Sequence, residues 1–183
     1  MTPDETLVEL AGGGDASARE ELFRRHFAVA YRVAYRLLGH EQDAMDAVQD
    51  GFLKAAVHLS DFDGRSGFRT WLLRVVTNSA LDSGRKRKRN KILRLEDGME
   101  QSAGATTFDD PTRGLRAEDL RAALNAALAR LSTETRATFV LFAEAGLSYK
   151  EIAEAQALPV GTVMSRLHYA RHKLQEYLAD IDY

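Results

Sequence analysis

Apolar residues recur at helical spacing along most of the chain. In the first half they predict one helix that ends at Gly39, a second over about residues 41–59 and a third that begins at Phe68. A turn with two glycines, two aspartates and two serines, Ser60–Gly67, separates the last two helices. No clean period-two alternation interrupts this pattern. The sequence therefore predicts an all-α fold.

The second half of the chain has a helical pattern of its own. Residues 96–114 are rich in glycine, serine and threonine and contain five acidic residues and one basic residue, which is typical of a linker. Apolar spacing resumes over residues 120–131, and Ser132 or Thr133 caps a further helix that ends at Gly146. We therefore expect two small helical domains joined by a flexible acidic linker, with boundaries at 1–95, 96–114 and 115–183.

The C-terminal segment has the pattern of a helix-turn-helix. Ser148 and Glu151 have the spacing of a capping box, Pro159 forces a turn, and a longer helix follows. The second helix of this motif enters the DNA major groove. Its predicted outer face carries Thr162, Met164, Ser165, Arg166, His168, Tyr169, Arg171 and Lys173. An ordinary helical hairpin with a polar outer face is the alternative.

Charge is segregated between neighbouring segments, although the 25 basic and 27 acidic residues nearly cancel overall. Residues 40–63 hold six acids and one base, whereas residues 64–94 hold ten bases and one acid. Opposite charge in adjacent blocks indicates two different binding surfaces, or else two solvated helix faces. Within the basic block, a predicted helix face carries Trp71, Arg74, Asn78, Asp82, Arg85 and Arg89.

This helix face adjoins five consecutive basic residues, Arg85–Arg89, which favour the binding of nucleic acid phosphates. Trp71 has two interpretations: it can stack on a base, or it can belong to the core. A solvated basic run without a ligand is the alternative for residues 85–89.

Several function classes are excluded or disfavoured. The absence of cysteine excludes disulfides, thiolate zinc sites and iron–sulfur clusters. His168 and His172 are four residues apart, but no third ligand lies near them, so we expect no metal, no cofactor and no catalytic centre, and an enzyme such as a nuclease is disfavoured. Without a long apolar run or a signal peptide, the sequence favours a protein of the reducing cytoplasm.

Several segments resemble a known family. Residues 43–54 (DAMDAVQDGFLK), 62–64 and 68–74, followed by Asn78 and Asp82, resemble region two of bacterial sigma-70 factors, the promoter-melting region. Residues 147–153 and 159–167 resemble region four. A chain with only these two regions and a short linker is similar to the extracytoplasmic-function (ECF) subfamily.

The resemblance implies a role in transcription initiation. The chain would bind the largest and second-largest subunits of core RNA polymerase, and its docking residues on the largest subunit would be Asp43, Asp46, Gln49, Asp50 and Phe52. Residues that read and melt the minus-ten element would be Phe62, Asp63, Arg65, Arg74, Asn78, Asp82, Arg85, Lys86, Arg87, Lys88 and Arg89. The C-terminal helix would read the minus-thirty-five element.

The resemblance also implies an anti-sigma factor, often membrane-tethered, that would hold the protein at the inner membrane. A conventional dimeric regulator of duplex DNA is the alternative, and the acidic helix argues against it. Four positions depart from the family pattern: Ala157 replaces a usual glycine, Ala155 and Gln156 replace a bulky apolar pair, and Met164 replaces a residue that is often basic. The linker and residues 40–63 are acidic whereas residues 64–94 are basic, so if the domains close on one another we expect the closure to be weak and sensitive to salt.

Overall fold

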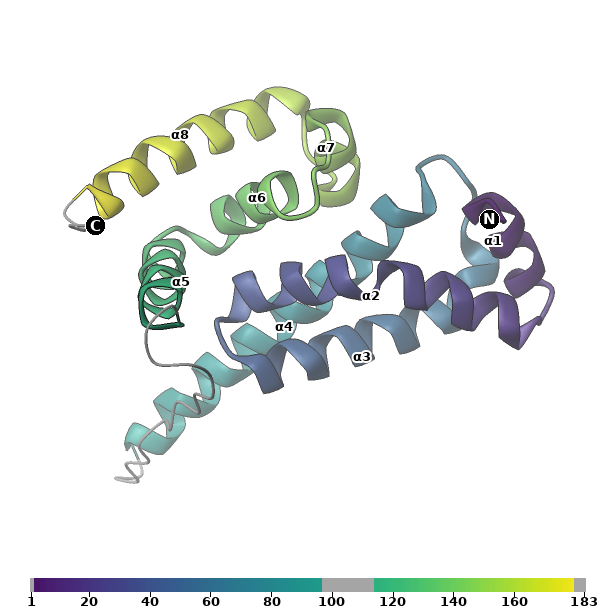
Figure 1. The fold of residues 1–183 in the computed structure, drawn as a ribbon, viewed down its shortest axis with the longest axis horizontal. Helices are drawn as coiled ribbons and strands as arrows, with labels where there is room; N and C mark the ends of the chain where they lie inside the picture. Colours follow the sequence, from purple (N-terminus) through teal and green to yellow (C-terminus); the bar gives the residue numbers. More distant parts are fainter. Residues whose placement is uncertain (1, 97–113, 180–183) are drawn as a thin grey trace.

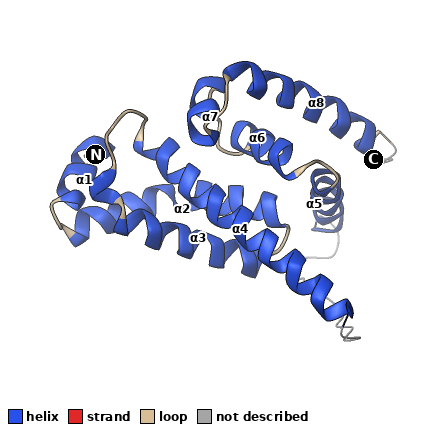
Figure 2. Ribbon diagram, turned by 180° about the vertical axis from the view of Figure 1, so that it is seen from behind, coloured by secondary structure: helices blue, strands red, loops and turns tan. Residues whose placement is uncertain are grey.

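The computed structural model describes residues 2–96 and 114–179, which are mostly helical and contain no strand within those ranges (Figures 1 and 2). The N-terminal domain comprises α1 (Asp4–Gly12), α2 (Ala16–Leu38), α3 (Glu41–Val57), the short 3₁₀ helix η1 (Leu59–Asp61) and α4 (Phe68–Glu96). The C-terminal domain comprises α5 (Gly114–Ala129), α6 (Thr133–Ala143), α7 (Tyr149–Gln156) and α8 (Val160–Leu178). The predicted all-α, two-domain organisation is confirmed, and most of the predicted linker, residues 97–113, lies outside the described residues.

The beginning of the chain contains a helix that the sequence pattern did not predict. Helix α1 is short and buries only Leu7 and Ala11, so its apolar periodicity is weak. Asp15 then caps α2, because its carboxylate accepts hydrogen bonds from the backbone N–H groups of the next turn at 2.9 and 3.0 Å. Helix α2 ends as predicted at Gly39, which adopts the left-handed conformation with φ 71°.

Helices α2, α3 and α4 form the core of the N-terminal domain (Figure 1). Leu22, Val48 and Leu72 are fully buried there, one from each helix. Helices α3 and α4 approach closely at Gly51, where a Cβ atom would lie 2.9 Å from Val76 Cγ2 and 3.0 Å from Val76 Cα. The glycine therefore sets the spacing between the acidic helix α3 and the basic helix α4.

The predicted helix-turn-helix is present in the C-terminal domain. Both bonds of the capping box form: Glu151 N–H donates to Ser148 Oγ at 3.3 Å, and Ser148 N–H donates to Glu151 Oε2 at 2.8 Å. Ala157 ends α7 in the left-handed conformation, with φ 52° and ψ 50°. Pro159 then precedes α8, which packs inward through one apolar face: Val163, Leu167, Ala170 and Leu174.

The two domains pack against each other through α2 and α4 on one side and α5, α6 and α7 on the other. Buried residues of both domains belong to one continuous apolar cluster. Arg36 Nε donates to Glu144 Oε1 at 2.7 Å, and Arg136 Nη1 donates to the Leu37 carbonyl at 3.1 Å. In these contacts arginines pair with a carboxylate and a carbonyl near helix ends, and most of the acidic linker on which the predicted attraction depends lies outside the described residues.

Candidate functional site

An acidic surface lies on the outward side of α3. Asp46, Gln49 and Asp50 are exposed, and Asp43 is half-buried at one end of the same helix. The surface continues into two apolar side chains that the sequence reasoning missed, Leu53 and Val57. We call these residues together the α3 outer face.

The apolar pair on the α3 outer face has an unusual exposure. Leu53 and Val57 are 69% and 73% exposed, far more than apolar side chains of the core. They lie four residues apart, on a different side of the helix from the buried residues Val48 and Ala55. This helical spacing is visible in the sequence and could have predicted the exposed apolar pair. A surface with carboxylates at one end and apolar side chains at the other is suited to a protein partner with a basic rim.

Phe52 does not lie on the α3 outer face. Its ring packs 4.9 Å from that of Phe23 and 6.2 Å from that of Phe27, measured between centroids. Phe52 is only partly exposed and attaches α3 to α2. The structure therefore places this predicted polymerase-docking residue in the packing between helices, where it supports the acidic surface.

The acidic surface meets the basic helix α4 across a groove. Lys54 Nζ lies 2.6 Å from Asp50 Oδ2 and 3.1 Å from Ser79 Oγ, and its hydrogen bond lowers the pKa of Asp50. Arg87 of α4 forms an ion pair with Asp43 of α3. The groove has a volume of about 740 Å³ and is lined by Asp46, Asp50, Lys54, Ser79, Asp82, Ser83, Arg85, Lys86 and Arg89.

The loop before α4 is anchored at both ends by aromatic rings. Phe62, Phe68 and Trp71 form a cluster with centroid separations of 5.4 to 5.9 Å. Phe68 is buried, whereas Phe62 and Trp71 are half-buried, so Trp71 is a packing residue with one accessible side. Between the anchors, Gly64 has φ 70°, and Asp63 Oδ2 lies 2.8 Å from Arg65 Nε.

A row of exposed polar side chains continues from this loop along α4. Arg74, Asn78 and Asp82 are exposed at helical spacing, and Asp82 forms an ion pair with Arg85. The basic run that follows is exposed throughout: Arg85, Lys86, Arg87, Lys88 and Arg89. We call these eight residues the α4 row. Its charge and exposure are those of a surface that binds phosphates.

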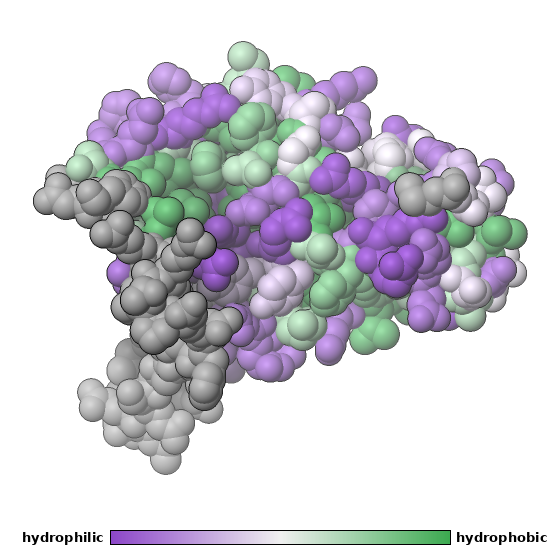
Figure 3. Space-filling model, viewed as in Figure 1, coloured by the Kyte–Doolittle hydropathy of each residue, from purple (hydrophilic) through white to green (hydrophobic). Residues whose placement is uncertain are grey.

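The outer face of α8 carries the third group of predicted site residues. Met164, Ser165, His168 and Tyr169 are exposed there, and hydrophilic side chains gather along this edge of the molecule in Figure 3. Other members of the group have partners inside the domain. Arg171 lies over the Phe142 ring at 5.0 Å, and Lys173 Nζ lies 2.7 Å from Glu176 Oε2.

Two predicted site residues on α8, Thr162 and Arg166, are half-buried. Of the two histidines on this helix, His168 is exposed, and His172 Nδ1 lies 3.1 Å from Glu176 Oε1. Within the ranges that the structure describes, no three His, Asp or Glu residues are grouped as metal ligands. None of the described helices offers an apolar stretch of membrane-spanning length.

Comparison with known proteins identifies both domains. Residues 22–90 match the family profile of Sigma-70 region 2, and residues 121–174 match that of Sigma-70, region 4. The ECF RNA polymerase sigma factor SigW of Bacillus subtilis is 30% identical over 175 residues, which cover 92% of each chain. The chain belongs to the ECF subfamily of sigma-70 factors.

Other sigma factors resemble this one over nearly its whole length. ECF sigma factor SigE of Mycolicibacterium smegmatis is 36% identical over 181 residues, which cover 97% of this chain and 68% of that relative. The solved structure of CnrH in complex with the cytosolic domain of CnrY superimposes with a TM-score of 0.75 at 31% identity, covering 97% of this sigma factor and 99% of CnrH. The sigma factor RpoE of Bartonella quintana, in complex with the anti-sigma factor NepR, gives a TM-score of 0.67 at 28% identity, over 89% and 97% of the two chains.

Membership of this family decides between the functional alternatives. A sigma-70 factor is a non-catalytic initiation factor that binds core RNA polymerase and directs it to promoter DNA. This chain carries both sigma-70 regions, which supports an initiation factor over a nuclease or a conventional dimeric regulator. The protein therefore acts in transcription initiation.

Proposed function

We propose that this sigma factor divides initiation among three surfaces. The α3 outer face docks on the clamp helices of the largest polymerase subunit, the loop 62–67 and the α4 row bind the minus-ten element, and the outer face of α8 binds the minus-thirty-five element. One observation carries this proposal: the acidic α3 outer face and the basic α4 row lie on two helices in close contact at Gly51 and Val76. A polymerase docked on one helix thus fixes DNA against the other.

Promoter melting needs no catalytic group in this proposal. The α4 row neutralises phosphates, and the loop 62–67 holds a base that has left the stack. Binding energy for single-stranded DNA then shifts the equilibrium between closed and open promoter complexes toward the open form. The cluster of Phe62, Phe68 and Trp71 gives the loop a rigid apolar base.

The α8 outer face reads duplex DNA in the major groove. Tyr169 presents a hydroxyl group that can bond to base edges, and Ser165 Oγ, which donates to the Gly161 and Thr162 carbonyls of its own helix, can accept from a base. Met164 is 54% exposed and offers an apolar contact, such as one with a thymine methyl group, in place of the basic contact usual in the family. The choice of minus-thirty-five sequence therefore depends on these three side chains.

An anti-sigma factor is the proposed regulator. One superimposed structure is the sigma factor RpoE bound to the anti-sigma factor NepR. The other is CnrH bound to the cytosolic domain of CnrY. A partner that covers the α3 outer face or the α4 row lowers by mass action the amount of protein that polymerase can bind. We place the sigma factor in the bacterial cytoplasm, held at the inner membrane when its partner is tethered there.

Charge reversal on the α3 outer face tests polymerase docking. Asp46→Lys together with Asp50→Lys replaces two carboxylates in a surface proposed to meet basic polymerase side chains. We expect the affinity for purified core polymerase to fall by tenfold or more, on the order of 1.4 kcal/mol. Fluorescence anisotropy of a labelled sigma factor, titrated with core polymerase, measures this affinity.

The matched control reverses two exposed acids elsewhere, Glu9→Lys on α1 and Glu20→Lys on α2. It has the same change in net charge, so a general electrostatic effect would weaken both double variants equally. Equal affinities of the two double variants for core polymerase would rule out the α3 outer face as the docking surface.

A further inference from the structure

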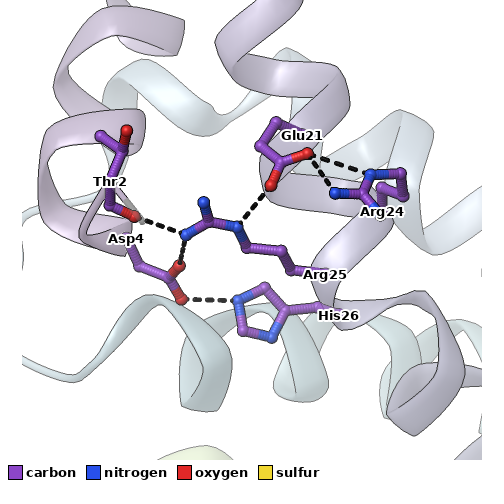
Figure 4. A network of polar contacts seen from close by, with 6 residues as sticks. All are labelled: Thr2, Asp4, Glu21, Arg24, Arg25 and His26. Carbon is purple, nitrogen blue, oxygen red and sulfur yellow. Dashed lines mark hydrogen bonds and ion pairs between the residues drawn. The ribbon is translucent and has the colours of Figure 1, made fainter.

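A polar network joins the unpredicted helix α1 to α2 (Figure 4). Asp4 Oδ2 lies 2.7 Å from His26 Nε2, and Asp4 Oδ1 accepts a hydrogen bond from Arg25 Nη1 at 3.1 Å. Arg25 also donates to the Thr2 carbonyl at 2.6 Å and to Glu21 Oε1 at 2.8 Å. Through the two oxygens of the Asp4 carboxylate, the network attaches the first turn of α1 to the middle of α2.

The histidine of this network has a second neighbour, the base of the proposed DNA-reading loop. His26 is only 8% exposed, and its ring lies 5.5 Å from that of Phe68, measured between centroids. Phe68 is the first residue of α4 and packs 5.9 Å from Phe62, at the other end of the loop. Contacts therefore run without interruption from Asp4 through His26 and Phe68 to Phe62 and Trp71.

Histidine has few stable orientations when it is buried with one ring nitrogen bonded to a carboxylate. Its bond to Asp4 restrains the orientation of the imidazole, which packs against the Phe68 ring at an interplanar angle of 53°. Without the carboxylate, a buried ring nitrogen loses its partner and the ring must rotate or become exposed. Either change removes support from Phe68 at the point where the loop meets α4.

We propose that Asp4 and His26 are positioning residues for the loop 62–67, so that α1 is part of the machinery that captures the unstacked minus-ten base. This inference rests on the proposed function, because it assigns that capture to the loop. Neither residue contacts DNA in the proposal. Their role is to hold Phe68, and through it Phe62, in the arrangement that presents the loop.

The first test uses the intrinsic fluorescence of Trp71, the one tryptophan of the chain. In the free full-length protein, Asp4→Ala is expected to shift its emission to longer wavelength and to increase its quenching by acrylamide, because the cluster loosens. Asp4→Asn keeps a carbonyl oxygen that can accept from His26 and is expected to restore the wild-type spectrum. Glu21→Ala breaks the bonds to Arg24 and Arg25 in the same network without touching His26, and is the control.

The second test measures base capture by holoenzyme on a promoter with 2-aminopurine at the unstacked position. Asp4→Ala and His26→Gln should reduce the fluorescence increase on open-complex formation by roughly three- to tenfold, as expected for loss of one hydrogen bond. Asp4→Asn should lie within about twofold of wild type. Affinity for core polymerase and thermal unfolding of each variant are measured alongside to show that the fold is retained.

Three results would overturn the inference. Unchanged Trp71 emission in Asp4→Ala would show that the carboxylate does not support the cluster. Unchanged base capture in Asp4→Ala would show that the loop does not need this support to hold the base. Equal losses of base capture in Asp4→Ala, Asp4→Asn and Glu21→Ala would show a general destabilisation of the domain. A wild-type holoenzyme that opens no promoter would instead refute the proposed function, while the fluorescence of the free protein still tests whether Asp4 supports the cluster through His26.

Discussion

Gly51 of α3 lies so close to Val76 of α4 that a Cβ atom at position 51 would come within 3.0 Å of the Val76 backbone. This contact holds the acidic and basic helices at a fixed spacing. Any larger residue must push them apart, since Val76 itself is fully buried.

Gly51→Ala should therefore destabilise the N-terminal domain by about 1–3 kcal/mol, the usual cost of overpacking a core. Urea denaturation measures the free energy of unfolding. The control is Gly84→Ala in α4, where the new Cβ would make an ordinary contact, 3.4 Å from Leu38 Cδ2. That change should stabilise the helix by about 0.5–1 kcal/mol, and an equal loss in both variants would refute the close-contact explanation.

Ala157 should gain stability when replaced by glycine. Its left-handed backbone, with φ 52°, costs an L-residue on the order of 1 kcal/mol that glycine avoids. We expect Ala157→Gly to raise the midpoint of thermal unfolding. Ala126→Gly, on the exposed side of α5, should lower that midpoint instead because glycine weakens a helix interior. A lower midpoint for Ala157→Gly would contradict the argument.

The α4 row and α8 should differ in their effects on DNA binding. Replacing Lys86, Lys88 and Arg89 by alanine removes exposed positive charge. Open-complex formation should weaken on all promoters, and the slope of log K against log salt should decrease by roughly 0.7–0.9 for each phosphate that the protein no longer neutralises. Filter binding of holoenzyme to promoter DNA over a range of salt concentrations measures both quantities.

Tyr169→Ala or Ser165→Ala should instead change the preference for particular minus-thirty-five bases, by about 1–3 kcal/mol at the base that is read. The control for the charge removed with Lys86, Lys88 and Arg89 is a variant with alanine at three exposed basic residues outside the α4 row: Arg24, Arg121 and Lys150. If both groups of substitutions changed base preference alike, the division between positioning and reading would fail.

The interface between the two domains should open when polymerase binds. Labels at Ala28 on α2 and Gln175 on α8, both exposed, report the separation of the two domains by electron paramagnetic resonance. Arg36→Ala removes two hydrogen bonds across the interface, to Glu144 and Asn125, and should increase the fraction of long distances in the free protein. Arg32 is more exposed and lies 3.7 Å from the same Glu144, so Arg32→Ala should have little effect.

A single distance shared by free and polymerase-bound protein would contradict this expectation. So would a larger opening in Arg32→Ala than in Arg36→Ala.

Local signals in the sequence predicted most of the helices. Gly39 ends α2, Ser148 and Glu151 open α7, and Pro159 precedes α8, because each acts on neighbouring backbone. Helix α1 was missed because its short apolar pattern is followed by three glycines, which favour a break.

The site was predictable in residue type but not in its contacts. Exposed carboxylates and the basic run were recognised from charge, yet the ion pair of Asp43 with Arg87 joins residues 44 positions apart. Phe52 was assigned to a surface, although its ring fills a space that only the packing of α2 against α3 creates. Likewise, the pairing of Asp4 with His26 depends on where α1 docks, which no local pattern specifies.

Reconstituted transcription tests the central claim most directly. Purified core polymerase is incubated with genomic DNA fragments, with and without the sigma factor, and the 5′ ends of the transcripts are mapped. We predict a small set of defined starts that appear only with the sigma factor, share upstream minus-ten and minus-thirty-five sequences, and disappear with the Asp46→Lys, Asp50→Lys variant. Transcripts whose starts are the same with and without the protein would contradict the claim.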